Sequence, residues 1–115
     1  MAVYANLSID QGSNFSSTIT VEDQDGIVFN LTGYTARGQI RKTYSSSTSV
    51  NFTVAVSSPA TNGKIEISLT ALQTLAFKPG RYVYDIEIVQ SANGSVTRVI
   101  EGQVEVNPRV TQVLV

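Results

Sequence analysis

Pro79-Gly80-Arg81-Tyr82-Val83-Tyr84-Asp85-Ile86-Glu87-Ile88-Val89 is the stretch of the chain that decides its fold. A period of two is the geometry of a pleated strand that has one buried face and one face in water. The alternating side chains here are Tyr82, Tyr84, Ile86 and Ile88 on one face against Arg81, Asp85 and Glu87 on the other. Pro79-Gly80 marks the start, because proline cannot donate to a ladder and glycine adopts turn dihedral angles. The stretch therefore predicts a central strand.

The same alternation recurs along most of the chain. Asp25-Gly26 and other turn signals separate the alternating segments, and Asp-Gly is a strong hairpin signal. Ala36 and Gly38 are small residues at inward positions, which indicates close approach of an opposite sheet. The segments are residues 3–9, 15–22, 34–41, 52–56, 65–69, 81–89 and 96–106. About seven short strands with regular turns predict an all-β fold, an antiparallel β-sandwich.

One short helical turn is expected near residues 70–76. Thr70 is a candidate N-cap, and apolar residues follow it at helical spacing. Gly80, Tyr82 and Tyr84 come next, as at the corner before the penultimate strand of immunoglobulin-like domains. There a tyrosine near the strand start donates its hydroxyl to the upstream backbone. Tyr82 takes that place, and Tyr84 stands where antibody domains carry a cysteine. We therefore expect an immunoglobulin-like sandwich with these three residues as its structural corner.

Length and composition fix the domain organisation. With 115 residues, the chain is long enough for one two-layer core and too short for two. Asn107-Pro108 breaks the last strand. We therefore expect a sandwich over residues 1–108 and an apolar C-terminal tail over residues 109–115.

Composition also argues against several classes of function. A net charge of −1 gives no electrostatic footprint for nucleic acid or an anionic membrane. No apolar run approaches the roughly 20 residues that span a bilayer, and the first residues lack the pattern of a signal peptide. The chain has no cysteine and no histidine, which removes thiolate chemistry, the commonest general base and the commonest transition-metal ligand. We expect no catalytic residue and no cofactor.

Two groups of carboxylates are candidate sites for chemistry. The turn Glu22-Asp23-Gln24-Asp25-Gly26 offers oxygens to Ca²⁺, but no glutamate follows at the spacing of an EF-hand, so a solvated hairpin turn is the simpler interpretation. Asp85 and Glu87 could form a glycosidase pair. Residues at this spacing on an exposed strand more often pair with cations across the sheet, here Arg37, Arg41 or Arg98. We therefore predict a protein that is not an enzyme and has no metal site.

The C-terminal tail is the most suggestive feature for function. Its last six residues include four aliphatic ones: Val110, Val113, Leu114 and Val115. Such a segment is expected to leave water. Either it packs on its own domain, or it adds as a strand to the open edge of a neighbour. These four residues and Tyr44, in the serine-rich loop 42–49, form the predicted assembly interface, with the edge residues 3–9 as second choice.

Four stretches of the chain form a recurring set: residues 31–41 (LTGYTARGQIR), 63–70 (GKIEISLT), 79–87 (PGRYVYDIE) and 101–106 (EGQVEV). The set resembles small structural proteins of tailed phages, especially those of cyanobacterial viruses. It is also similar to the N-terminal immunoglobulin-like domain of phage upper baseplate proteins. The resemblance covers roughly residues 6–111.

The resemblance implies a non-enzymatic virion structural protein, assembled in the bacterial host cytoplasm, that binds neighbouring virion proteins in the tail or baseplate. It implies a homo-oligomer or many copies on a symmetric lattice, where repetition converts weak contacts into stable attachment. Two alternatives stay open. One is a capsid decoration (cement) protein. The other is a carbohydrate-binding module for the host surface, in which Tyr44 would contact the sugar.

Overall fold

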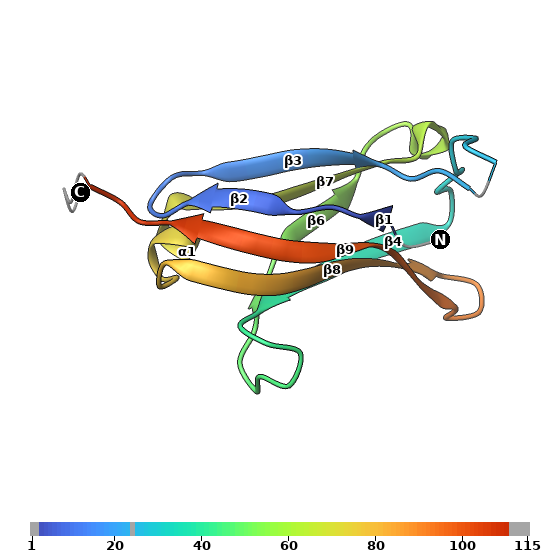
Figure 1. The fold of residues 1–115 in the computed structure, drawn as a ribbon. Coiled ribbons are helices and arrows are strands. Elements are labelled where there is room, and N and C mark those ends of the chain that lie inside the picture. The colour runs from blue at the N-terminus through green and yellow to red at the C-terminus, as the bar shows by residue number, and fades with distance from the viewer. Residues whose placement is uncertain (1–2, 24, 111–115) are drawn as a thin grey trace.

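The computed structural model describes residues 3–23 and 25–110 and consists of two β-sheets packed face to face (Figure 1). The larger sheet contains, in spatial order, β1 (Val3–Tyr4) and β2 (Leu7–Asp10), then β9 (Val96–Asn107), β8 (Gly80–Gln90), β4 (Tyr34–Arg41) and β5 (Val50–Asn51). The smaller sheet contains β3 (Phe15–Thr20), β7 (Lys64–Leu69) and β6 (Thr53–Val56). β1 and β2 run parallel to β9, and the other pairs are antiparallel.

The predicted all-β sandwich is confirmed. Seven of the described strands have four or more residues, and β1 and β5 add two residues each. β8, which contains the alternating residues 81–89, lies between β4 and β9 in the middle of the larger sheet. Its inward side chains Tyr84, Ile86 and Ile88 are buried. They pack with inward residues of the opposite sheet, among them Ile65, Ile67 and Leu69 of β7.

The helical turn forms where the sequence predicts it. α1 (Ala71–Leu75) begins after Thr70, whose hydroxyl accepts from the Gln73 backbone N–H while the Gln73 side chain accepts from the Thr70 N–H, a capping box. A single 3₁₀ turn, η1 (Ala60–Asn62), precedes β7. After α1, the Tyr82 hydroxyl donates to the Lys78 carbonyl at 2.7 Å. No helix in the described ranges is long and apolar enough to cross a membrane.

The first predicted strand, residues 3–9, is not continuous. It divides into β1 and β2, with Ala5 and Asn6 between them outside the ladder. The backbone of Ala5 lies against Gly102 of β9, so close that a Cβ on Gly102 would stand 2.0 Å from the Ala5 carbonyl oxygen. The Asn6 side chain accepts from the Gln103 N–H at 3.1 Å. The strand breaks because these contacts replace regular pairing at that point.

The chain between β4 and β7 changes sheets at Phe52. β5 pairs with β4 only at Gln39 and Ile40, and β6, which begins one residue after Phe52, pairs with β7 in the other sheet. Because the crossing comes so early, β5 covers only the last part of β4. This short pairing shapes the candidate site described next.

Candidate functional site

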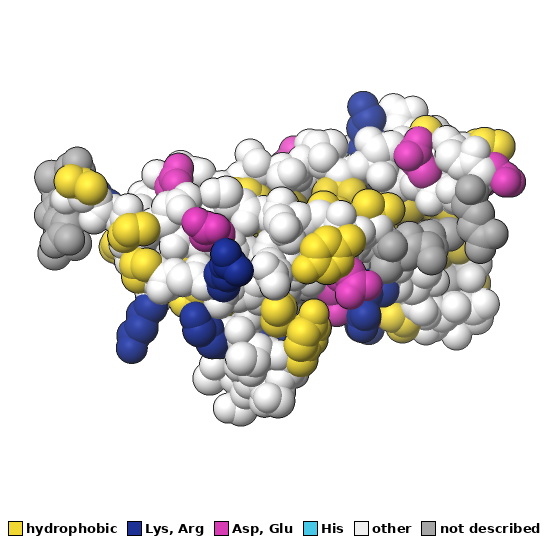
Figure 2. All heavy atoms as spheres, in the orientation of Figure 1, with side chains coloured by type: hydrophobic (Ala, Val, Ile, Leu, Met, Phe, Trp, Pro, Cys, Tyr) yellow, Lys and Arg dark blue, Asp and Glu magenta, His cyan; other side chains and the backbone are white. Residues whose placement is uncertain are grey.

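The outward face of the larger sheet carries paired charges. The Arg37 Nε and Glu87 Oε1 atoms are 3.0 Å apart, and the Arg98 Nε and Asp85 Oδ2 atoms are 3.4 Å apart. Arg98 Nη1 also lies 3.8 Å from Glu101 Oε1. A bulge in β9 at the Ile86/Glu87 register shift brings Arg98 and Glu101 to the same face beside Asp85. Figure 2 shows both signs of charge interspersed over this side of the molecule.

The predicted cross-strand cations therefore meet the two β8 carboxylates, through Arg37 and Arg98. Arg41 instead donates to the Ser46 carbonyl and to the Gln39 side chain. Burial, followed by the charges of Glu87 and Glu101, raises the pKa of Asp85 above its ordinary value, while Arg98 and Arg41 act in the opposite direction. Both carboxylates thus lie on the outward face of the sheet, each within reach of an arginine.

The loop between β4 and β5 lies beside this charged face, where Tyr44 lines the same hollow as Asp85 and Arg98. A turn closes it, in which the Ser46 N–H donates to the Thr43 carbonyl at 3.1 Å. Tyr44 lies in that turn with 80% of its surface exposed. Together with Gln39, Arg41 and Val83 it borders a shallow hollow of about 330 Å³. The loop places one aromatic ring beside polar side chains, which is the arrangement that a sugar contact would need.

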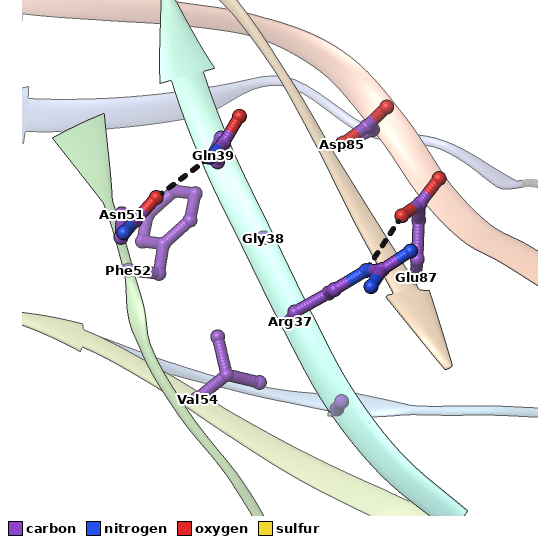
Figure 3. A pocket seen from close by; sticks show the side chains of 9 residues that line it. Arg37, Gly38, Gln39, Asn51, Phe52, Val54, Asp85 and Glu87 are labelled. Carbon is purple, nitrogen blue, oxygen red and sulfur yellow. Dashed lines mark hydrogen bonds and ion pairs between the residues drawn. The ribbon is translucent and has the colours of Figure 1, made fainter. Parts of the chain in front are cut away.

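A groove lies beside the part of β4 that β5 leaves uncovered (Figure 3). It has a volume of about 530 Å³, and Ala36, Gly38, Phe52 and Val54 form its apolar side. Figure 3 shows the Phe52 and Val54 side chains pointing toward β4, with the Gln39–Asn51 hydrogen bond of 2.8 Å at one end. The Phe52 N–H donates to the Gly38 carbonyl at 3.0 Å. Beyond that bond, among the described residues, no strand pairs with β4 on this side.

The sequence predicts that the small residues of β4 lie close to the opposite sheet. A Cβ added to Gly38 would lie 2.3 Å from Ile86 Cδ1, in the same sheet, and 3.3 Å from Phe52 Cδ2. The tightest neighbour is thus the adjacent strand, and the ring that crosses between the sheets comes second. The absence of a side chain at Gly38 nevertheless leaves room for the Phe52 ring, which lines the groove.

The predicted assembly residues lie in different places. Val110 is 95% exposed at the end of the described chain, whereas Val113, Leu114 and Val115 lie outside the described residues. Tyr44 is exposed, as above. Residues 3–9 form the other edge of the larger sheet, where β1 and β2 are bound to β9.

The Glu22–Gly26 turn, of which Gln24 lies outside the described residues, is a hairpin turn. Asp23 Oδ1 accepts from the backbone N–H groups of Asp25 at 2.9 Å and Ile27 at 3.0 Å. The carboxylate of Asp23, a candidate ion ligand in the sequence, thus caps the backbone of its own turn. Within residues 3–23 and 25–110, no three acidic side chains are grouped as a metal site would require.

Sequence reasoning did not single out the groove. Phe52 and Val54 read as ordinary inward residues of one strand, and Ala36 as a residue of close packing. The available signal was the length of the segment after loop 42–49, which is too short to pair fully with β4 and then join the other sheet.

No model of a known protein family matches the chain, and no curated protein matches its sequence. Among solved structures, InlP of Listeria monocytogenes is similar with a TM-score of 0.49 and 16% identity, over 92% of this chain and 28% of that one. A family 123 glycoside hydrolase from Clostridium perfringens is similar with a TM-score of 0.42 and 13% identity, over 93% and 23%. The chain spans about a quarter of the length of these two proteins.

Proposed function

We propose that the chain is a non-enzymatic structural protein of a phage particle that binds neighbouring virion proteins in the tail or baseplate. The observation that carries the proposal is the edge of β4 that β5 leaves unpaired, beside a groove lined by both apolar and charged side chains. An exposed strand edge presents unpaired N–H and C=O groups, so an extended segment of another protein can add to it as a strand. The resemblance of the sequence to phage structural proteins is the reason for proposing that the partner is another protein of the tail or baseplate.

The charged face supports a binding role over a catalytic one. Its ion pairs join β4, β8 and β9 across the sheet, as Arg37–Glu87 and Arg98–Asp85 show. Each exposed pair contributes little stability, about 0–1 kcal/mol, but a face with fixed, alternating charge selects for a partner of complementary pattern. On a symmetric lattice, weak contacts of this kind add through effective concentration.

The experiment is to purify particles of the phage that encodes the chain and to quantify its peptides by mass spectrometry against those of the major capsid and tail proteins. We expect the chain at a fixed ratio to a tail or baseplate protein. Immunogold labelling then locates it. Gold on the tail end supports the proposal, gold on the head identifies a capsid decoration protein, and absence from washed particles refutes a structural role.

A carbohydrate-binding module is the second candidate, favoured by Tyr44. Tyr44 is the most exposed tyrosine among the described residues, and it lines the same hollow as Gln39 and Arg41. Binding of the purified chain to a glycan array, lost on Tyr44→Ala and kept on Tyr4→Ala, would support it. Tyr4 is the matched control because it is also exposed, at 62%, but lies on the β1 edge.

A further inference from the structure

The strand β3 forms an open edge of the smaller sheet. It pairs with β7 on one side, and among the described residues no strand pairs with it on the other side. Figure 1 shows β3 as the outermost strand along the upper margin of the molecule. At the opposite edge of this sheet, β6 has only four residues and follows directly on Phe52, whose N–H donates to the Gly38 carbonyl of β4. β3 is therefore the long exposed edge of the smaller sheet.

The register of β3 shows which of its backbone groups face this edge. The Val21 N–H donates to the Gly63 carbonyl at 2.7 Å, in line with the antiparallel register of β3 and β7. Residues two apart on a strand direct their backbone groups to the same side, so the odd-numbered residues of β3 bond to β7. The residues whose N–H and C=O groups face the open edge are thus Ser16, Thr18 and Thr20.

The sequence of β3 lacks the features that keep strand edges apart. Charged side chains, proline, bulges and very short strands all make an edge a poor template for a further strand. β3 has six residues, Phe-Ser-Ser-Thr-Ile-Thr, with no charge and no proline, and its register with β7 is unbroken. By contrast, β2 has four residues and ends at Asp10, and β4 carries Arg37 and Arg41. β3 is therefore the edge best suited to continuous pairing.

β3 is also complementary to a second copy of itself. When two such strands lie antiparallel with Thr18 opposite Thr18, Ser16 of each lies opposite Thr20 of the other, and every one of these pairs can exchange both main-chain hydrogen bonds. The outer face then joins hydroxyl side chains only, and such Thr and Ser pairs are favourable across strands. On the inner face, Phe15 and Ile19 are partly exposed in the single chain and become covered.

We propose that two copies of the chain associate through their β3 strands, antiparallel, about a two-fold axis at Thr18. The two smaller sheets become one, in the order β6-β7-β3 of one copy followed by β3-β7-β6 of the other. The contact uses the same surface of both copies, so it closes at a dimer. This inference goes beyond the proposed function, because it joins copies of the chain and leaves the β4 edge free for another protein.

Sedimentation velocity on the full chain and on two variants tests the contact. Thr18 on β3 and Ala55 on β6 are both exposed, and both lie opposite Glu66 of β7. Thr18→Glu places like charges opposite each other at the two-fold axis, whereas Ala55→Glu adds the same charge beside the same neighbour, away from the contact. We expect the unchanged chain to dimerise at several hundred micromolar. Ala55→Glu keeps this association, and Thr18→Glu weakens it at least tenfold.

Mixing variants of opposite charge extends this test. An equimolar mixture of Thr18→Glu and Thr18→Lys proteins is expected to restore association, since opposite charges then meet at the axis. Thermal unfolding checks that each variant melts cooperatively. The proposal is overturned if the unchanged chain stays monomeric at several hundred micromolar, or if the Thr18→Glu and Ala55→Glu proteins associate equally.

Cysteine cross-linking tests the register, because the chain has no cysteine of its own. In the proposed pairing, the Cα atoms of Ser16 and of the partner's Thr20 are roughly 5.5 Å apart, which suits a disulfide, whereas the two Ser16 Cα atoms are roughly 14 Å apart. Isotope-labelled Ser16→Cys protein is mixed with unlabelled Thr20→Cys protein under mild oxidation. Mass spectrometry is expected to find the mixed 16–20 disulfide in at least tenfold excess over either homodisulfide. A statistical mixture of the three, or an excess of homodisulfides, would contradict the antiparallel contact.

Discussion

The two edges of the larger sheet differ in how they end. At the N-terminal edge, β1 and β2 are short, broken at Ala5, and bound to β9 by main chain and side chains. The Ala5 N–H donates to the Glu101 carbonyl at 2.8 Å, and the Ala5 carbonyl accepts from the Tyr84 hydroxyl at 2.6 Å. At the other edge, β4 is an unbroken strand of eight residues, of which β5 covers two.

The difference shows how one sheet can protect one edge and offer the other. Short strands and irregular pairing make an edge a poor template for a further strand, whereas a long regular edge is a good one. The Tyr84 hydroxyl donates to the Ala5 carbonyl next to Gly102 and so holds the N-terminal edge against β9. We infer that the N-terminal edge stabilises the domain and the β4 edge binds.

The largest expected effect comes from filling the space at the closed edge. In Gly102→Ala the new methyl would stand 2.0 Å from the Ala5 carbonyl oxygen and 2.7 Å from its carbonyl carbon, which are main-chain atoms that cannot rotate away. Strand β1 must then separate from β9. We expect a loss of about 3 kcal/mol or more in the free energy of unfolding, the upper part of the range for overpacked sites, measured by urea denaturation.

Gly38→Ala is the matched change at the open edge. Its methyl would meet Ile86 Cδ1 at 2.3 Å, the end of a flexible side chain, although the Asp85 carbonyl oxygen at 2.9 Å limits the relief. We expect a loss of about 1–2 kcal/mol. Equal losses at Gly102 and Gly38 would mean that the N-terminal edge is not held more tightly than the β4 edge.

A smaller effect is expected from the hydroxyl that closes the N-terminal edge. Tyr84→Phe leaves the Ala5 carbonyl without its donor, which costs about 1–2 kcal/mol. Tyr82→Phe removes a bond of similar length to the Lys78 carbonyl in an exposed corner, so we expect about half that loss. Thermal and urea unfolding of both variants test the order, and a larger loss at Tyr82 would contradict it.

Tyr84 also makes the free energy of unfolding depend on pH in the alkaline range. Burial, with a smaller contribution from Tyr4, raises the pKa of Tyr84 to about 12 from an ordinary value of 10.0. The unfolded chain therefore loses this proton first, and stability falls as pH rises above 10. We expect Tyr84→Phe to lose less stability between pH 9 and pH 11 than the unchanged protein, and parallel losses would contradict the assignment.

Local patterns in the sequence predict most of this fold. Period-two alternation locates β3, β4, β7, β8 and β9, because a half-buried strand needs it regardless of its neighbours. The capping box at Thr70 and Gln73 is local as well, and so is the bond from Tyr82 to Lys78. These features join residues close together in the sequence, so the sequence alone contains enough information to find them.

What the sequence does not predict depends on contacts between distant residues. The break at Ala5 exists because Gly102 leaves room for its backbone, and alternation across residues 3–9 continues through it undisturbed. The open edge exists because the chain changes sheets at Phe52, and alternation cannot say which strand becomes an edge. Alternation in the sequence therefore shows that the residues of the groove face inward, but it does not show that the strand edge beside them is unpaired.

The smallest expected change in stability comes from Asp85, on β8 between the two edges of the larger sheet. The pKa of this carboxyl is raised by burial and by Glu87 and Glu101, which outweigh its ion pair with Arg98. The folded protein therefore keeps this proton after the unfolded chain has lost it, and stability falls as pH rises above the ordinary value of 3.8. Asp85→Asn is expected to reduce that fall and to change stability at pH 7 by less than about 0.5 kcal/mol, since exposed pairs contribute little.

Glu87→Gln is the control for Asp85→Asn, because it breaks the shorter pair with Arg37 on the same face of β8. We expect it to destabilise the protein at pH 7 by about 0.5 kcal/mol. Urea unfolding of both variants at several pH values between 4 and 7 separates the cases. If Asp85→Asn destabilised as much as Glu87→Gln at pH 7, the pair with Arg98 would hold β8 to β9. The charged face would then strengthen the closed side of the sheet as well as select a partner.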